Sequence, residues 1–226
     1  MSARVLSVNV GEAKTGVLRS GSTGIDKHPV DSIAVFDPGP KGIGASGVDG
    51  DAVVNRKHHG GTFQAVYAVA NEELDWWSVD LGRDLRPGAF GENLTTAGFD
   101  VDASLIGEQW RIGGSVILTV TAPRVPCATF AAHMAVSGWV KAFAARGRTG
   151  AYLAVTQPGT IHPGDEIHVA WRPSHGVTVP EMFRAWMGDR DLARRILEAD
   201  ALNVVDRAAL EAKLAKWEHS RSATTS

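Results

Sequence analysis

The chain has 226 residues, of which 44% are hydrophobic and 21% charged, and its formal net charge is −2. These are ordinary values for a soluble globular protein, and the near balance of charge gives no global reason to expect nucleic acid or an anionic membrane as partner. The single cysteine, Cys127, excludes internal disulfides and therefore the disulfide-stapled secreted folds. No apolar run approaches the ~20 residues of a membrane helix, and the N-terminus lacks a signal-peptide pattern. We therefore expect a cytoplasmic protein without membrane contact.

The first two-thirds of the chain is predicted to be rich in β-strands. Short runs that are β-branched or alternate apolar and polar residues are separated by Gly, Pro and Asp, which is typical of barrels and sandwiches. These runs span 4–10, 64–70, 115–122, 151–156 and 165–171. Residues 37–51 contain too much glycine and proline for a helix and are expected to form a loop or bulged strand.

Two helical patterns interrupt the strands. Residues 71–82 begin with Asn71 as the expected N-cap, carry acids in the first turn and end in a glycine. Residues 128–146 form a second helical stretch, in which Gly138 is expected to mark a break.

The last part of the chain is predicted to be helical. Residues 178–188 start with a capping box formed by Thr178 and Glu181, and helical patterns follow at 189–199 and 206–218. Three short amphipathic helices bury little core alone, so we expect them to dock on the β domain or on a partner subunit. The sequence thus predicts a mainly β fold with α, divided into a β domain over 1–172, a three-helix module over 173–220 and a disordered tail over 221–226.

Cys127 is the first candidate for chemistry. Arg124 lies three residues before it, Pro126 precedes it directly, and the following residues are predicted to be helical. A thiol at the start of a helix and near a guanidinium is favoured as the thiolate, which attacks electrophiles or binds a soft metal. The alternative is a buried cysteine that serves only as a small apolar side chain.

The stretch "KHHGG" is the second candidate. Adjacent histidines in a strand point to opposite faces, and no further ligands follow at zinc-site spacing, so a dedicated metal site is disfavoured. A cradle for an anionic group fits better: Lys57 supplies charge, Gly60 and Gly61 expose backbone N–H groups, and His58 or His59 donates a hydrogen bond. An ordinary glycine turn with solvated charges is the alternative.

A third candidate is the glycine-rich loop "PGAFGENLT" at 87–95. Gly91 allows the backbone to approach a ligand closely, and the amide of Asn93 both donates and accepts hydrogen bonds. Without other evidence, the same stretch is equally typical of a connection between strands.

Together these stretches resemble the MOSC family, the domain also found at the C-terminus of molybdenum cofactor sulfurases. The order and spacing of the motifs carry the resemblance, which covers about residues 3–218: "GIDKHPV" (24–30), "GVDGDAVVNRKHHGGTFQAV" (47–66), "PGAFGENLT" (87–95), "IGEQWRIG" (106–113) and "APRVPC" (122–127). The C-terminal helices are similar to the three-helix extension of the stand-alone bacterial YiiM-like branch. Val48 departs from the leucine expected in the family's turn, but Gly50 and Asp51 are kept.

The resemblance implies a MOSC-type β-barrel that binds molybdenum cofactor (molybdopterin), a pterin dithiolene with a phosphate. It implies that Cys127 ligates molybdenum or carries sulfur as a persulfide, and that His59 and Asn93 join it in catalysis, a histidine delivering a proton. The residues expected to line the cofactor or substrate pocket are Lys57, His58, His59, Gly91, Asn93 and Arg124. Related proteins reduce N-hydroxylated compounds such as hydroxylaminopurines, hydroxamates and amidoximes.

Two functions remain open at this stage. One is a molybdenum-dependent oxidoreductase that detoxifies N-hydroxylated small molecules; the other is a cofactor-handling or sulfur-carrier protein that holds a persulfide on Cys127 without turnover. The sequence has no iron–sulfur cysteines and no Rossmann fingerprint, so we expect a separate electron-donor protein. Pyridoxal phosphate is not expected, because in this family it belongs to a fused sulfurase domain. The apolar faces of the C-terminal helices leave a homodimer open.

Overall fold

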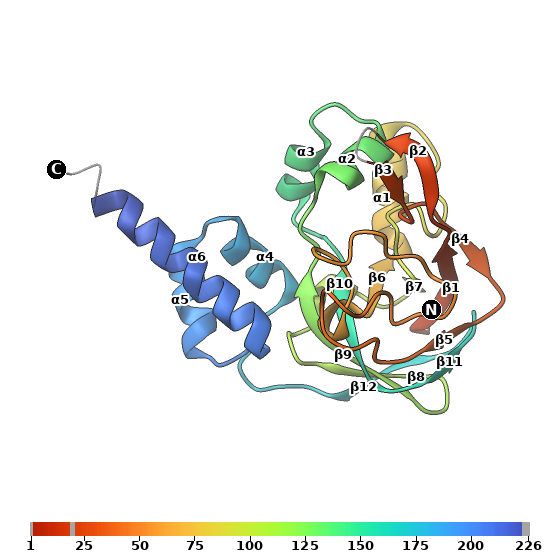
Figure 1. Ribbon diagram of the computed structural model, residues 1–226. Helices are drawn as coiled ribbons and strands as arrows, with labels where there is room; N and C mark the ends of the chain where they lie inside the picture. The colour runs from red at the N-terminus through yellow and green to blue at the C-terminus, as the bar shows by residue number, and fades with distance from the viewer. Residues whose placement is uncertain (1, 19–20, 223–226) are drawn as a thin grey trace.

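The computed structural model of the chain describes residues 2–18 and 21–222 (Figure 1). Its centre is a sheet of eight strands. In spatial order the strands are β12 (Ile167–Trp171), β8 (Gln109–Ile112), β9 (Val116–Pro123), β10 (Ala151–Gln157), β6 (Val66–Ala70), β7 (Leu94–Ala97), β1 (Arg4–Gly11) and β4 (Lys27–Val30). Two small sheets pair β11 (Gly159–Ile161) with β5 (Ile33–Val35), and β2 (Lys14–Leu18) with β3 (Gly21–Thr23).

The mainly β class with α is confirmed, and each of the five predicted runs holds a strand. The hydrogen-bonded order of the sheet is open, however, so the expected barrel is not closed by a continuous ladder within the described ranges. The sheet curls back on itself nonetheless: Arg4 forms an isolated bridge with Glu166, and the N–H of Val5 donates to the carbonyl of Asp165 at 2.8 Å.

The pair β6–β7 is parallel, whereas the other pairings in the large sheet are antiparallel. Parallel neighbours need a crossover connection, and here it is α1 (Asn71–Leu81). The helix was predicted, but its N-cap is Ala70 rather than Asn71. Strand β6 remains extended up to Ala70 and turns directly into the helix, so Asn71 is already helical and donates to Asp75 Oδ2 at 2.9 Å.

The predicted stretch 128–146 is two helices, α2 (Ala128–Met134) and α3 (Trp139–Arg146). The break lies where it was expected, with Gly138 at φ +71°. These helices and α1 enclose a second, aromatic core beside the sheet. Its large rings are Tyr67, Trp77, Phe90, Phe130, Trp139 and Phe143. Short 3-10 turns at η1 (Thr62–Gln64) and η2 (Val101–Ala103) complete the connections.

The C-terminal helices are α4 (Val179–Met187), α5 (Arg190–Glu198) and α6 (Val204–Ser222), which lie together beside the sheet, with α4 packed against β9 (Figure 1). The predicted capping box is present, since Thr178 Oγ1 accepts from the Glu181 N–H and Glu181 Oε2 accepts from the Thr178 N–H. Apolar residues of all three helices join the same buried cluster as the sheet. The division into domains near residue 172 stays a prediction.

The predicted tail over 221–226 overlaps the end of α6, which runs to Ser222; residues 223–226 lie outside the described residues. None of the helices in the described ranges combines the length and apolarity needed to cross a membrane.

Candidate functional site

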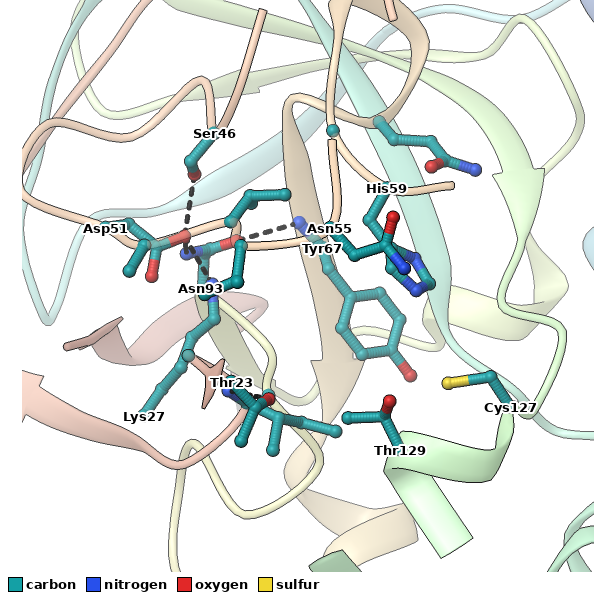
Figure 2. Close-up of a pocket in the computed structure, with 18 of the residues that line it drawn as sticks. Thr23, Lys27, Ser46, Asp51, Asn55, His59, Tyr67, Asn93, Cys127 and Thr129 are labelled. Carbon is teal, nitrogen blue, oxygen red and sulfur yellow. Dashed lines mark hydrogen bonds and ion pairs between the residues drawn. The ribbon is translucent and has the colours of Figure 1, made fainter. Parts of the chain in front are cut away.

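A pocket opens where four segments meet: the loop before β4, residues 46–60, the β6–β7 region and the start of α2. It encloses about 730 Å³ of space including its mouth, which lies within the range of small-molecule and cofactor sites. Figure 2 shows Lys27, Ser46, Asp51 and Asn93 gathered at one side of it and Cys127 at the other.

Cys127 lies at the junction between β9 and α2. Its backbone is extended (φ −121°, ψ 169°), and the helix begins at the next residue. The thiol is free and half-buried, and it points into the pocket near the ring of Tyr67 and the side chain of Thr129 (Figure 2). Phe130, one turn into the helix and fully buried in the aromatic core, holds this junction in place.

Arg124 places a buried cation in the wall of the pocket. Its guanidinium lies over the rings of Phe130 and Tyr67, 4.0 and 4.8 Å from their centroids, and donates to the carbonyl of Phe90. No carboxylate forms an ion pair with it in the described part of the chain. Burial by itself lowers the pKa of Arg124, but the neighbouring Tyr67 and Cys127 raise it, so the side chain stays charged. A buried cation without a partner charge is costly, and this wall therefore favours an anionic ligand.

Lys27 and Asp51 form a buried ion pair at the opposite side, with Nζ–Oδ2 at 2.5 Å and side chains 8% and 0% exposed. Asp51 also accepts from the Gly11 N–H at 2.9 Å, Ser46 Oγ at 2.6 Å and Asn93 Nδ2 at 3.1 Å. Burial raises the pKa of Asp51, but the charge and hydrogen bond of Lys27 help to lower it by a larger amount. The net shift is therefore downward. Burial lowers the pKa of Lys27, and Asp51 opposes that shift. The carboxylate thus ties together four segments that shape the pocket.

Asn93 lines the pocket, but its hydrogen bonds are made within the protein. Its amide nitrogen donates to the carbonyl of Asn9 at 3.2 Å and to Asp51, and its Oδ1 accepts from the Tyr67 N–H at 3.2 Å. The side chain is therefore placed to hold β1, β6 and the Asp51 cluster in register.

Gly91 also lines the pocket, next to residue 25. Its φ is +75°, and a Cβ there would lie 2.9 Å from the carbonyl oxygen of Ile25. Only glycine meets both conditions, so this position keeps the loop close to the wall of the pocket.

The residues of "KHHGG" are not brought together as an anion cradle. His59 is half-buried and lines the pocket, whereas His58 is exposed and lines only an adjoining groove, and Lys57 is exposed and borders neither hollow. The N–H of Gly61, expected to face an anion, donates instead to the carbonyl of Ala45 at 2.9 Å. The glycines pack this loop against residues 41–45 because they have no Cβ.

Among the described residues that line the pocket, His59 is the one imidazole. Burial lowers its pKa, and the nearby positive charges of Arg124 and Lys41 lower it further. At neutral pH the ring is therefore mostly neutral. Within residues 2–18 and 21–222 no three His, Cys, Asp or Glu side chains are grouped so that they could hold a metal ion.

Several lining residues were not singled out from the sequence. Lys27 and Asp51 lie in "GIDKHPV" and "GVDGD", two stretches that carry the family resemblance. These motifs could therefore have indicated that both residues belong to the site. Tyr67 and Tyr152 lie in ordinary strand patterns, and nothing in the sequence indicated that they line a pocket. The side-chain oxygen of Gln64, also in the wall, is buried without a hydrogen-bond partner among the described residues.

Comparison with known proteins agrees with this geometry. The sequence profile of the MOSC domain matches residues 55–168, a span that includes the histidine loop, the glycine-rich loop and Cys127. The chain belongs to the MOSC domain family.

Individual relatives extend the likeness beyond that span. The uncharacterized protein YflK of Bacillus subtilis is 31% identical over 221 residues, covering 96% of this chain and 91% of its own. Protein YiiM of Escherichia coli is 29% identical over 163 residues, 70% of this chain and 72% of its own. A protein of Gibberella moniliformis named "Reductase" is 31% identical over 173 residues, 75% of this chain but 29% of that protein.

Among solved structures, YiiM from Geobacillus stearothermophilus superposes with a TM-score of 0.74 at 27% identity, covering 94% of this chain and 99% of its own. YiiM from Escherichia coli has the same fold, with a TM-score of 0.71 at 22% identity, covering 96% of this chain and 94% of its own. With coverage this high, the likeness extends past the matched MOSC span into the C-terminal helices.

Proposed function

We propose that this MOSC protein binds molybdenum cofactor in the pocket at Cys127 and reduces N-hydroxylated small molecules in the cytoplasm. The observation that carries the proposal is a free thiol beside a buried guanidinium that has no carboxylate partner among the described residues. A thiolate is a soft ligand suited to molybdenum, and a guanidinium binds a phosphate or another anion.

The donor set of the pocket fits the cofactor in charge and in size. Two cationic side chains, Lys27 and Arg124, line it against one carboxylate, Asp51, and a neutral His59 leaves the balance positive. Cys127 is the side chain that would hold the metal, Arg124 the one that would face the anionic part, and Gly91 would let the backbone approach the pterin. When bound, the cofactor supplies a two-electron redox centre at the thiol end of the pocket.

The side chains of the protein itself supply the protons for the reaction and the wall of the site. Reduction of R–NHOH to R–NH2 breaks the N–O bond, consumes two electrons and two protons and releases water. His59 is placed to relay protons, because it lines the same pocket as Cys127 and its lowered pKa leaves the ring neutral, so one ring nitrogen can accept a proton while the other releases one. Tyr67 serves as wall rather than proton donor, since its hydroxyl donates to the carbonyl of Thr149 at 2.7 Å.

The electrons come from a separate donor protein in this proposal. The relative named "Reductase" supports an oxidoreductase role, and this chain spans less than a third of it.

The decisive experiment compares wild-type protein with Cys127→Ala. Freshly purified wild-type protein should contain molybdenum and pterin and should reduce benzamidoxime with a chemical electron donor, and the variant should lose the reduction while keeping the wild-type melting temperature. Full reduction by Cys127→Ala would remove the thiol from the mechanism. Lys57→Ala is the control, because this exposed side chain lines neither the pocket nor the adjoining groove.

A sulfur-carrier role is the second candidate, supported by the half-buried thiol that opens into a pocket. It predicts that mass spectrometry of the intact protein finds one added sulfur atom on Cys127, removed by reductant, and no reduction of N-hydroxylated compounds with any donor. Turnover without the added sulfur would exclude it.

A further inference from the structure

A groove continues outward from the pocket and is open to solvent. It encloses about 1260 Å³ including its open side, and it shares Cys127, His59 and Tyr152 with the pocket. A molecule lying in the groove with one end in the pocket would therefore place that end at the thiol.

The two sides of the groove come from different parts of the fold. One side is the segment around Cys127, where Val125 is 46% exposed. The other side is formed by α4 and α6, through Trp186, Val205 and Ala209. These helices lie beyond the matched MOSC span, which ends at residue 168.

Apolar side chains face the groove from both sides, alongside the polar Lys41, His58 and Asp206. Val205 is 49% exposed, so both flanking valines keep much of their surface in water, and Trp186 is only partly buried against the core. Exposed apolar side chains that converge in a hollow are typical of ligand sites. The oxygen of Gln64, buried without a partner in the described chain, also borders the groove and offers an acceptor to a ligand N–H.

The helical side is held firmly in place. Leu210 and Leu214 of α6 are 0% and 9% exposed and belong to the cluster that includes the sheet. Asn203 Oδ1 accepts from the N–H of Asp206 at 3.0 Å, which fixes the first turn of α6 at the position of Val205. A wall fixed in this way discriminates by shape, since it does not yield to a poorly fitting ligand.

We propose that α4 and α6 form the specificity wall of the substrate site, and that it selects N-hydroxylated compounds carrying an aromatic or bulky apolar group over small ones. The apolar group lies between Val125 and the helical wall, and the N–O group reaches the pocket at Cys127. This inference rests on the proposed reduction at Cys127.

The test uses holo-protein with two probes, benzamidoxime and the smaller acetamidoxime, and two matched variants. Val205 borders the groove, whereas the adjacent Val204 is 74% exposed and does not. Both lie at the start of α6, where a carboxylate is favourable, so Val205→Asp and Val204→Asp should fold equally well.

Val205→Asp should raise the KM for benzamidoxime about tenfold or more, and it should leave the KM for acetamidoxime and the molybdenum content unchanged. Val204→Asp should change none of these quantities. Trp186→Ala should also weaken the binding of benzamidoxime but not of acetamidoxime. If this variant has a lower melting temperature than the wild type, the comparison of Val205→Asp with Val204→Asp is the test.

Calorimetric binding of both probes separates this inference from the proposed function. Tighter binding of benzamidoxime that is lost in Val205→Asp supports the wall even if neither probe is reduced, in which case only the proposed reaction fails. The wall is overturned if wild-type protein binds both probes equally, or if Val205→Asp leaves benzamidoxime binding intact or weakens both probes alike.

Discussion

Replacing Asp51 by alanine should destabilise the protein strongly, because this carboxylate neutralises a buried lysine. The Asp51 side chain is 0% exposed and its partner Lys27 is 8% exposed. In the variant the Lys27 ammonium stays buried without its ion-pair partner, and the backbone N–H of Gly11 and the side-chain N–H of Asn93 lose an acceptor.

The expected loss can be scaled from similar pairs. Removing one partner of a buried ion pair costs about 3–5 kcal/mol, against a total stability of about 5–15 kcal/mol for a folded protein. For a chain of this size, each kcal/mol shifts the melting temperature by about 2–4 °C, so Asp51→Ala should melt about 10 °C lower. Because the shape of the pocket depends on this cluster, the variant should also retain less molybdenum if the proposed function holds.

Urea unfolding of four proteins measures the effect: wild type, Asp51→Ala, Lys27→Met and the double variant. Lys27→Met should cost less than Asp51→Ala, since Asp51 keeps three other donors, and the double variant should recover part of the loss. The pKa of Asp51 lies below its ordinary value of 3.8, so its contribution is present at neutral pH and disappears only as the pH falls below that value. A loss under about 1 kcal/mol, or a double variant that is no more stable than Asp51→Ala, would refute the reasoning.

Three further outcomes test other parts of the structure. Burial raises the pKa of Asp102 to about 6, so wild-type stability should fall by up to about 3 kcal/mol as the pH rises from about 4 to 6; urea titrations of Asp102→Asn should lack that decline, and equal slopes would contradict the assignment. Gly60 and Gly50 have φ of +78° and +73°, but a Cβ at 60 would lie 2.2 Å from the Ala45 carbonyl oxygen, whereas a Cβ at 50 would meet nothing within 4 Å. Gly60→Ala should therefore lower the free energy of unfolding more than Gly50→Ala. Equal losses would argue against a packed loop. Thr178→Ala removes the capping box and should cost about 1 kcal/mol, seen as faster amide exchange in the first turn of α4; unchanged exchange would show that the cap contributes nothing.

The sequence predicted the long strands well because their pattern is local. The β-branched runs that became β1, β9 and β10 alternate or stay apolar over five or more residues, and each lies within one or two residues of its predicted bounds. Strand β7 (Leu94–Ala97) was missed. It begins inside the predicted glycine-rich loop, and its pairing with β6 depends on the crossover through α1 rather than on its own alternation.

In the candidate site, too, residues in local motifs were predicted, whereas contacts between distant segments were not. Cys127, Arg124, Gly91 and Asn93 were named from motifs, and all four line one pocket. Lys57 was named as a site residue and Lys27 was not, but the packing of its glycine loop leaves Lys57 exposed, whereas Lys27 is buried. Proximity along the chain is a poor guide to which of two lysines is buried, because burial is decided by segments far away in sequence.

By itself the sequence determined the mainly β class and the capped C-terminal helices, since periodicity and caps are properties of neighbouring residues, and its motifs carried the resemblance to the MOSC family. Only the tertiary structure decided that Lys27 meets Asp51 across 24 positions and that Asn93 meets it across 42. It likewise decided that α6 borders the groove beside Cys127. Such contacts form when the whole chain buries its apolar surface, and no local pattern encodes which distant side chains that collapse brings together.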